Sequence, residues 1–469
     1  MTRRSRGLDS VFLSLETATN LYHVGAVTVL DPATAPPGTP APYDAVRRLI
    51  EERLHLLGPF RRRLAGVPLG LDHPRWVEDT DIDIGFHLRR GHLPRPGGAA
   101  ELAVYAADVL SRPLDRTRPL WEMHVVEGLD GDLVAGVTKI HHSVIDGVAG
   151  VELTANLMDL TPQTAPTPPP PEDWRADPWP SAAGLVGDGL RRLTGLGARA
   201  SAAALEAAGA AIRIADHNRQ PESTAPPAPF TAPRTPIGVR VGTRRVAGLG
   251  RVERADVDQV RSATGASVND VILFLAATVL RDYLAQRGEL PDKPLVAAVP
   301  VSVRAAHDTL DTGVNKLSGM LVSLATTVED PRARLAAIRE SVRNAKEQDR
   351  LLGSALVERA TDLFPPVVMT PAAWLAQRTG LMTRRPAFNV IVSSFPGSPV
   401  PLYCAGAKVL AYHPFGPVSD GASLNITAMS YIDHIGFGFL ADGDAAPDVD
   451  ALAARLPEAL TELAKEIGT

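Results

Sequence analysis

The sequence predicts an α/β protein of two lobes joined by a long, proline-rich crossover. Its 469 residues exceed the roughly 250–300 at which a single core stops growing, so two domains are expected. Strand-like and helix-like segments alternate in both halves, which favours an α/β architecture. Composition changes sharply between residues 161 and 236, where prolines gather around Pro168–Pro171. Such a stretch is typical of a linker between lobes.

The first lobe is expected to cover residues 1–160. Its strand pair is joined by the turn Leu129-Asp130-Gly131-Asp132, whose residues suit a hairpin. Apolar residues at helical spacing predict a helix directly after the second strand. The expected elements, in order, are helices over Asp44–Leu56 and Leu102–Leu110, strands over Trp121–Glu127 and Leu133–Ile140, and a helix over Gly147–Leu160.

The crossover, residues 161–236, is expected to be extended at both ends, because proline fixes φ and removes backbone donors. Its middle part, Ser181–His217, is rich in alanine and is predicted to be helical. A second interpretation makes this segment an amphipathic surface helix that touches a membrane through Arg191, Arg192, Arg199 and Arg213.

The second lobe is expected to cover residues 237–469, again with strands and helices interleaved. The expected elements are a helix over Val268–Arg287, a buried strand over Leu295–Val303, a helix over Asp330–Gln348, a strand over Phe388–Ser393, and a hairpin of Ser423–Tyr431 and Ile435–Leu440.

The bulk composition excludes several classes of protein. The net charge is −5 and basic residues are scattered among acidic ones, which argues against nucleic-acid binding. The single cysteine, Cys404, permits no disulfide within the chain and fits a reducing cytoplasm; we expect it to be inert. The basic N-terminus lacks a following apolar region, and the longest apolar stretch, Val271–Leu280, is about half of what crosses a bilayer. We expect a cytoplasmic protein without a membrane span, able to lie on a membrane or lipid-inclusion surface.

The segment His141–Gly147 reads His-His-Ser-Val-Ile-Asp-Gly and lies between a predicted strand and a predicted helix. A neutral imidazole in such a loop can act as a general base, because its pKa is close to neutral pH. Asp146 can cap the following helix or accept an arginine. From the local residues alone, a turn with two half-exposed histidines is an equal alternative. A metal site of His141, His142 and Asp146 is disfavoured, because adjacent histidines in a turn usually point apart.

The spacing His-His-x-x-x-Asp-Gly also resembles the active-site motif of the bacterial wax ester synthase/diacylglycerol acyltransferase family. That family is part of the coenzyme A-dependent acyltransferase superfamily, with chloramphenicol acetyltransferase and condensation domains. Further blocks resemble the family in the right order along nearly the whole chain: Leu8–Phe12 with Glu16-Thr17 and His23–Gly25, Pro113–Glu122, Ser267–Val271, Val299–Arg304 with Asn315, Asn389–Ser393 with Pro396-Gly397, Asp420-Gly421, and Leu424–Ile426.

The resemblance implies two similar chloramphenicol acetyltransferase-like lobes with a tunnel between them. It also implies that His142 is the general base and that His141 shapes the pocket beside it. Asp146, before Gly147, then has a structural role as the ion-pair partner of an arginine, for which Arg304 is our candidate. The implied reaction transfers an acyl group from the co-substrate acyl-CoA to diacylglycerol or a long-chain alcohol, without an acyl-enzyme, a bound cofactor or a metal.

Further residues are weaker candidates for the site. Asn269 is predicted to orient the substrate carbonyl, whereas Asp270 fits a helix-capping box with Ser267. Pro119, Leu120 and Trp121 line an acyl channel in one interpretation and pack in the core in the other. Asn425 is either a site residue or a core amide whose hydrogen bonds are satisfied within the protein.

The sequence departs from the family pattern at three places, which leaves the acceptor open. Ser394 stands where asparagine is common, Ser143 where alanine is frequent, and Gly313-Val314-Asn315 replaces a Gly-Asn pair. Alternative functions are a lipid or acyl-CoA carrier without catalysis, acyl transfer to a polyketide or amine, and thioester hydrolysis.

Overall fold

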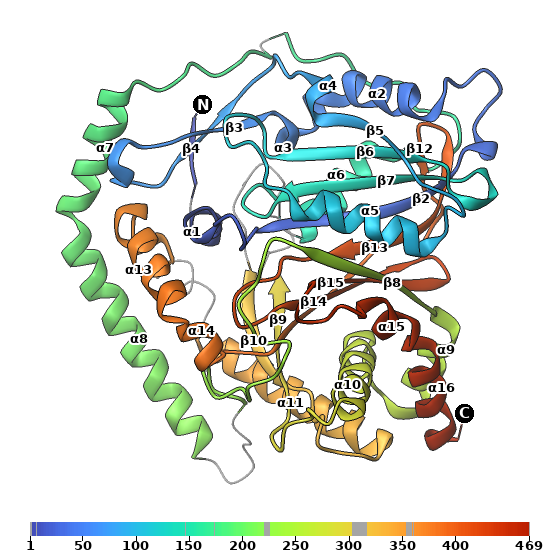
Figure 1. Ribbon diagram of the computed structural model, residues 1–469. Coiled ribbons are helices and arrows are strands. Elements are labelled where there is room, and N and C mark those ends of the chain that lie inside the picture. Colours follow the sequence, from blue (N-terminus) through green and yellow to red (C-terminus); the bar gives the residue numbers. More distant parts are fainter. Residues whose placement is uncertain are drawn as a thin grey trace.

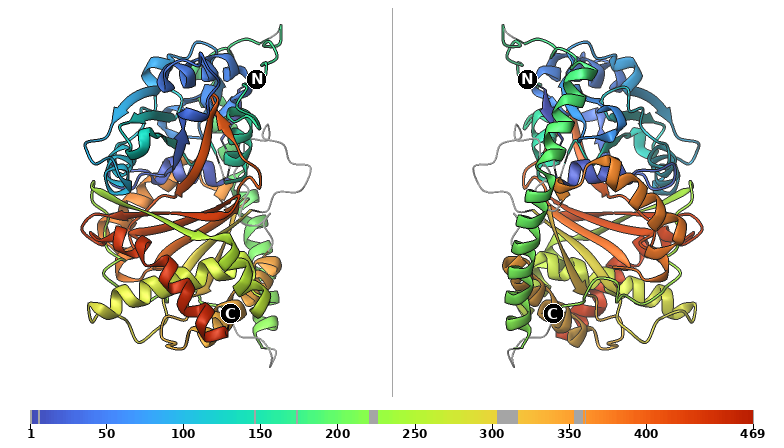
Figure 2. Two further views of the ribbon diagram at one scale, coloured as in Figure 1. Left: turned by 90° about the vertical axis from the view of Figure 1, so that its right-hand side faces the viewer. Right: turned by 90° about the vertical axis from the view of Figure 1, so that its left-hand side faces the viewer.

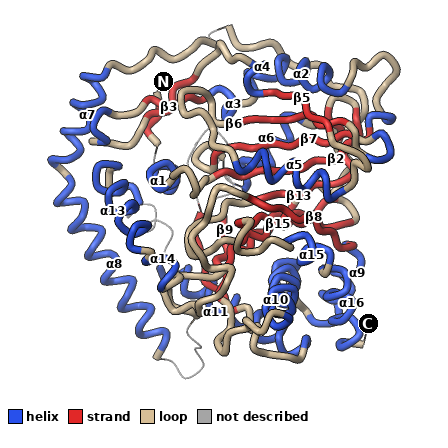
Figure 3. The backbone as a smooth tube through the Cα atoms, in the orientation of Figure 1, coloured by secondary structure: helices blue, strands red, loops and turns tan. Residues whose placement is uncertain are grey.

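The structure is a computed structural model of the chain. It describes all residues except Met1, Arg6, Asp146, Asp173, 220–225, 303–316, 353–358, Ala360 and Thr469. Two six-stranded sheets, each with its own helices, form the upper and lower lobes of Figure 1. The predicted α/β, two-lobed architecture is therefore confirmed, and Figure 3 shows helices on the outside of both sheets.

The upper lobe is built on a sheet in which neighbouring strands are antiparallel except for the pair β5 and β6. Its strands in spatial order are β12 (Tyr403–Cys404), β13 (Ala407–Phe415), β2 (His23–Asp31), β7 (Val134–His141), β6 (Trp121–Glu127) and β5 (Leu88–His92). A small sheet beside it contains β1 (Arg3–Arg4), β4 (Arg75–Glu78) and β3 (Arg62–Ala65). The strands predicted around the Asp130-Gly131 turn are β6 and β7.

Helices cover both faces of this sheet because successive strand residues point to opposite sides. Val137 of β7 packs in the core that α5 (Ala99–Ser111) covers, while Ile140 packs in the core formed with α2 (Pro42–Arg53) and α6 (Gly147–Leu157). The remaining helices of this lobe are short: α1 (Gly7–Leu15), α3 (Gly58–Arg61) and α4 (Ile84–His87).

The lower lobe is built around the buried helix α10 (Val268–Gln286), in which every residue from Val271 to Leu280 is at most 4% exposed. Its sheet contains β10 (Leu317–Ser323), β9 (Val296–Ser302), β11 (Val390–Pro396), β14 (Leu424–Tyr431), β15 (His434–Asp442) and β8 (Arg245–Glu253) in spatial order. The other helices among the described residues of this lobe are α9 (Arg254–Thr264), α11 (Pro331–Leu352), α13 (Pro366–Thr379), α14 (Leu381–Arg384), α15 (Val449–Ala454) and α16 (Leu456–Ile467). The predicted hairpin is β14–β15.

One part of the predicted division between lobes differs from the structure. β12 and β13 lie in the C-terminal half of the chain, but β13 pairs with β2 from Phe415 opposite Gly25 to Lys408 opposite Asp31. These two strands thus belong to the upper sheet, although the sequence placed residues 237–469 in the second lobe. A strand's local pattern shows that it pairs, not with which strand it pairs.

β13 also packs directly on the lower sheet, so it joins the two lobes. A Cβ atom added to Gly436 or Gly438 of β15 would lie 1.8 Å from the carbonyl oxygen of Tyr412 or 2.0 Å from that of Pro414. Glycine at these positions therefore permits the close approach of the two backbones. Next to them, Nδ1 of the buried His413 lies 3.1 Å from the carbonyl oxygen of Phe437.

The buried His413 predicts a loss of stability in acid. Burial lowers the pKa of His413 to about 4, whereas an exposed histidine in the unfolded chain titrates near about 6.5. Protons therefore bind the unfolded state first, and His413 disfavours folding as the pH falls from about 6.5 to about 4. The shift corresponds to about 3 kcal/mol. Between pH 7 and pH 4, the free energy of unfolding of His413→Gln, measured with urea, should fall by about 3 kcal/mol less than that of the wild type. A variant with the exposed His92 substituted is the control and should lose as much stability as the wild type. Equal acid losses in all three proteins would contradict the prediction.

The crossover is helical as predicted, in two segments that meet at Gly195: α7 (Ala182–Thr194) and α8 (Leu196–Asn218). α8 runs along the outside of the molecule from the upper toward the lower lobe (Figure 2). The arginines of both helices contact the protein itself: Arg192 lies 3.4 Å from Asp72 and 3.2 Å from Asp362, and Arg213 donates to the carbonyl of Leu351. The interpretation of this segment as a membrane-facing helix therefore gains no support from its arginines.

Among the described residues, no single helix is long and apolar enough to cross a membrane. The pair α9 and α10 meets that criterion together, with a bend of 105° between them.

Candidate active site

The two histidines lie at the end of β7, as the sequence predicts. His141 is the last residue of β7 and pairs with His23 of β2, and the backbone N–H of His142 donates to the carbonyl of Tyr22 at 2.7 Å. The next helix, α6, begins at Gly147. The loop is thus anchored through backbone bonds on the strand side.

The side chain of His142 is partly exposed and lies against an aromatic stack. Its ring centroid is 4.6 Å from that of Phe12 in α1, and Phe12 in turn stacks on Tyr22 at 5.3 Å. Ring contacts of this kind restrict the orientation of the imidazole. His142 is therefore held against the stack while part of its side chain stays exposed.

His141 turns into the protein and is only 1% exposed. Its Nδ1 accepts the backbone N–H of Ser143 at 3.1 Å and lies 2.6 Å from the Ser143 hydroxyl oxygen. Because a backbone N–H can only donate, Nδ1 is the acceptor nitrogen and the proton is on Nε2. The neighbouring histidines thus point apart, and the described residues include no group of three side chains suited to a metal ion.

A largely buried carboxylate, Glu16, organises the groups behind the histidine loop. Its two oxygens lie 3.4 Å from Nε2 of His23 and 3.6 Å from Nε2 of His141, and the Arg116 guanidinium donates to it at 2.9 Å. Burial alone would raise the pKa of Glu16, but the two histidines and the charge of Arg116 outweigh it and hold that pKa well below its usual range. Burial lowers the pKa of His23 to about 4 and also lowers that of His141. At neutral pH a carboxylate therefore faces two neutral imidazoles.

Sequence reasoning used Glu16 only as one letter of a family block and missed this role. One indication was its position directly after α1, whose last turns carry the apolar residues Val11, Phe12, Leu13 and Leu15.

Glu16→Gln is expected to loosen the histidine loop. The amide has a similar size but no charge, so Arg116 loses its ionic acceptor and His141 loses its carboxylate partner. Hydrogen bonds to charged groups contribute about 1.5–3 kcal/mol each, which sets the expected loss in the free energy of unfolding. A displacement of the loop by an ångström would lower turnover by up to about 10²-fold. Urea unfolding and single-turnover acyl transfer should be measured beside Glu51→Gln, an exposed carboxylate of α2; wild-type values for Glu16→Gln would refute the positioning role.

The start of α10 in the lower lobe carries the next two candidates. The Ser267 backbone donates to the Asp270 carboxylate at 2.8 Å, and the Asp270 backbone donates to the Ser267 hydroxyl at 3.2 Å. This is the predicted capping box, so Asp270 has a structural role. Asn269 accepts a hydrogen bond from the Ser394 hydroxyl of β11 at 2.9 Å. Ser394 is one of the positions at which this sequence departs from the family pattern.

Comparison with known proteins now decides the family. Residues 6–272 match the wax ester synthase/diacylglycerol acyltransferase catalytic domain, and residues 314–464 match the C-terminal domain of the same family. A putative diacylglycerol O-acyltransferase of Mycobacterium tuberculosis is 36% identical over 462 residues, which is 98% of this chain and 90% of the relative. The chain belongs to the wax ester synthase/diacylglycerol acyltransferase family.

Other relatives agree with this assignment. A putative diacylglycerol O-acyltransferase of Mycobacterium bovis is 32% identical over 469 residues, 98% of each chain. The structure of the wax ester synthase/diacylglycerol acyltransferase from Marinobacter aquaeolei VT8 matches with a TM-score of 0.70 and 28% identity over 100% of both chains. The first condensation domain of the calcium-dependent antibiotic synthetase, at 17% identity and a TM-score of 0.57 over 100% of this chain and 97% of that one, shares the fold. The protein is thus an acyl-CoA-dependent O-acyltransferase with the fold that the resemblance implied.

The Pro119-Leu120-Trp121 block lies beside the histidine strand, because Trp121 begins β6 and pairs with Ile140 of β7. The Trp121 ring is stacked between Phe60 at 4.0 Å and His87 at 4.5 Å, and it is 1% exposed. The carbonyl of Leu120 accepts the backbone N–H of His141 at 3.0 Å. These contacts fit the core-packing alternative, in which the block supports the histidine strand.

Asn425 fits the core-amide alternative. Its side chain is 1% exposed, and its Oδ1 accepts the Gly416 N–H at 3.1 Å and the Thr427 hydroxyl at 2.7 Å. Its Nδ2 donates to the carbonyl of Pro417 at 3.3 Å. The amide therefore fixes the chain where it leaves β13.

Three predicted residues remain: the pair Asp146 and Arg304, and the single cysteine, Cys404. Asp146 and Arg304, the expected ion pair, both lie outside the described residues, so their pairing stays a prediction. Burial raises the pKa of the Cys404 thiol to about 12, which leaves it protonated and a poor nucleophile at neutral pH.

Proposed function

We propose that this acyltransferase moves a long-chain acyl group from acyl-CoA to diacylglycerol, a long-chain alcohol, or both, with His142 as the general base. One observation carries the assignment of the base. Of the two adjacent histidines, His141 is buried and engaged with Ser143, while His142 is partly exposed at the end of the strand. Family membership supplies the reaction class, and the acceptor is our extension of it.

The proposed reaction is a direct transfer. His142 removes the proton of the acceptor hydroxyl as that oxygen attacks the thioester carbonyl. A carbon–oxygen bond forms, the carbon–sulfur bond breaks, and the imidazolium returns the proton to the departing coenzyme A sulfur. General base catalysis contributes about 10²–10⁴-fold, and holding the two substrates together contributes much of the remainder.

The packing of Ser143 supports a route without an acyl-enzyme. Ser143, His141 and Glu16 form a chain of residue types like that of a serine hydrolase, with Ser143 Oγ 2.6 Å from the imidazole. However, Ser143 is 2% exposed, so a thioester cannot reach its hydroxyl without displacing the loop. These three side chains therefore hold the turn that carries His142.

Two further roles complete the proposal. Because the Asn269 Oδ1 accepts from Ser394, its Nδ2 is the group available to donate to the thioester oxygen. One such donor contributes roughly 2.7–4 kcal/mol in other enzymes. We further propose that Asp146 and Arg304 form a structural ion pair, that the substrates meet His142 in a tunnel between the lobes, and that the enzyme works from the cytoplasm on a membrane or lipid-inclusion surface.

Product analysis tests the proposal. Purified protein is incubated with labelled palmitoyl-CoA and either dioleoylglycerol or hexadecanol, and the lipids are separated. We expect ester that depends on the acceptor, with the ratio of the two esters assigning the preferred substrate. Free acid formed regardless of acceptor would indicate a thioesterase. Binding of the thioester without any product would favour a lipid carrier, or an enzyme for a polyketide or amine acceptor.

A further inference from the structure

Helix α13 has an apolar face that the protein does not cover. None of its 14 residues is buried. Val367, Val368, Trp374 and Leu375 are 42%, 45%, 56% and 55% exposed. Their spacing of one, seven and eight residues places them on one side of a helix. A surface helix normally turns such a side toward the core, but here the opposite side, with Met369, Ala373 and Ala376, is the less exposed one.

Neighbouring elements enlarge this surface. Phe364 precedes α13 and is 42% exposed, Leu381 in α14 is 48% exposed, and Leu69 in the short turn Pro68–Gly70 is 81% exposed. The turn packs against α13, since a Cβ atom on Gly70 would lie 3.1 Å from the Val367 nitrogen. We define the α13 patch as Leu69, Phe364, Val367, Val368, Trp374, Leu375 and Leu381. Figures 1 and 2 show α13 on the outside of the molecule, beside α8.

The patch ends in positive charge that the protein leaves unneutralised. Residues 363–419 contain neither aspartate nor glutamate. Exposed arginines follow the apolar face, and two more reach it from the end of the crossover and the start of the second lobe. Arg234 donates to the carbonyl of Arg384 at 2.9 Å, and Arg240 donates to that of Gln377 at 2.6 Å. Within the described part of the chain, no carboxylate lies within 4 Å of the five arginines at this end, which are Arg234, Arg240, Arg378, Arg384 and Arg385.

The pairing of these arginines differs from that of the arginines on α7. There, Arg191 pairs with Asp188, and Arg192 pairs with Asp72 and Asp362. On α13, Arg378 instead lies over the exposed Trp374 ring, 5.2 Å from its centroid. An exposed tryptophan between an apolar strip and arginines without a carboxylate partner is the arrangement of a helix that lies in a membrane interface.

We propose that the α13 patch docks on the surface of an anionic phospholipid bilayer. The apolar side chains enter the boundary between headgroups and acyl chains, and the arginines contact the anionic headgroups. This proposal rests on the proposed function, since it identifies the surface from which a lipid acceptor is taken.

The position of α13 relative to His142 links docking on the bilayer to the proposed acyl transfer. α13 packs on α1, where Nε2 of Gln377 lies 3.4 Å from the Thr17 hydroxyl that follows the helix. The same α1 carries Phe12, whose ring is tilted against that of His142 with 4.6 Å between the centroids. One short helix therefore separates the docked surface from the proposed base, so that docking through α13 would bring the base close to the bilayer.

Vesicle binding tests the proposal directly. Wild-type protein is sedimented with vesicles of phosphatidylglycerol and phosphatidylcholine, and with phosphatidylcholine alone, at low and high salt. We expect binding to the anionic vesicles that weakens with salt. Trp374→Ser/Leu375→Ser should bind at least tenfold more weakly, and Arg384→Gln/Arg385→Gln should lose the preference for anionic vesicles. The matched control is Leu205→Ser/Ile212→Ser on α8, whose side chains are 76% and 62% exposed and which should bind like the wild type.

Acyl transfer separates this proposal from the proposed function. The Trp374→Ser/Leu375→Ser variant should lose transfer to dioleoylglycerol in vesicles while keeping transfer to soluble hexanol. Wild type that binds vesicles but forms no ester would refute the proposed function and leave the docking surface standing. Equal vesicle binding by wild type and patch variant would overturn the docking proposal. A wild-type dimer that the same substitutions dissociate would also overturn it, because the patch would then be an interface between copies.

Discussion

Replacing His142 with alanine is expected to reduce acyl transfer by about 10²–10⁴-fold, the usual contribution of a general base. The fold should survive, because the backbone N–H of His142 still donates to Tyr22 and the rest of the loop is anchored through His141. The lost ring contact with Phe12 makes a small decrease in stability the expected side effect. Palmitoyl-CoA should still bind, since the imidazole acts on the acceptor hydroxyl.

The measurement is single-turnover ester formation together with thermal unfolding and thioester binding. His92→Ala, which removes an exposed histidine at the end of β5, is the matched control and should behave like the wild type. Wild-type turnover in His142→Ala would remove His142 as the base. Loss of ester together with loss of thioester binding would assign the residue to substrate binding instead.

The sequence predicted the elements whose determinants are local. The strands β6 and β7 are separated by a Gly-containing turn, and α10 begins at a capping box, so their bounds follow from neighbouring residues. The histidine loop could be placed between a strand and a helix for the same reason. Local residues also indicated that Asp270 caps a helix rather than binds substrate.

Features that depend on distant contacts could not be predicted in this way. Glu16 becomes part of the site only because β2 pairs with β7 and brings His23 beside His141. β13 joins the upper sheet through pairing with β2, which its own residues do not reveal. The apolar side chains of α13 have the pattern of a core helix, and only their exposure in the fold separates a docking surface from a packed face.

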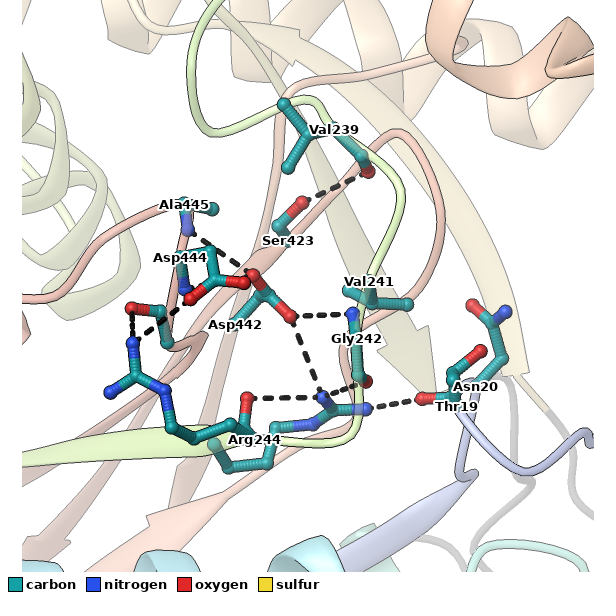
Figure 4. Close-up of polar contacts among 12 residues, drawn as sticks. Thr19, Asn20, Val239, Val241, Gly242, Arg244, Ser423, Asp442, Asp444 and Ala445 are labelled. Atoms are coloured by element: carbon teal, nitrogen blue, oxygen red, sulfur yellow. Dashed lines mark hydrogen bonds and ion pairs between the residues drawn. The ribbon is translucent and has the colours of Figure 1, made fainter.

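Asp442→Asn is expected to lower the free energy of unfolding by about 3–5 kcal/mol, the usual result when a buried ion pair loses one partner. Asp442 ends β15 and faces Arg245 at the start of β8, with 3.8 Å between the charged atoms and 2% exposure for each side chain. The carboxylate also accepts the N–H groups of Gly242 at 2.7 Å and Asp444 at 3.0 Å (Figure 4).

The expected loss of stability arises mainly from Arg245, because its charge would remain buried without its counter-charge. Arg245 also donates to the carbonyl of Thr19, so the pair secures the start of the upper lobe against the lower sheet. Asp444→Asn is the matched control: its ion pair with Arg244, at 3.0 Å, is exposed and should contribute less than about 1 kcal/mol.

A second variant separates the unpaired charge from the loss of hydrogen bonds. In Asp442→Asn/Arg245→Met neither charge remains, so urea unfolding should show it to be more stable than Asp442→Asn alone, because burying an uncompensated charge costs more than losing the pair. If the double variant were instead destabilised by the sum of the two single substitutions, the pair would act through independent hydrogen bonds. The N–H groups of Gly242, Asp444 and Ala445 around the carboxylate, rather than the guanidinium, would then account for the burial of Asp442.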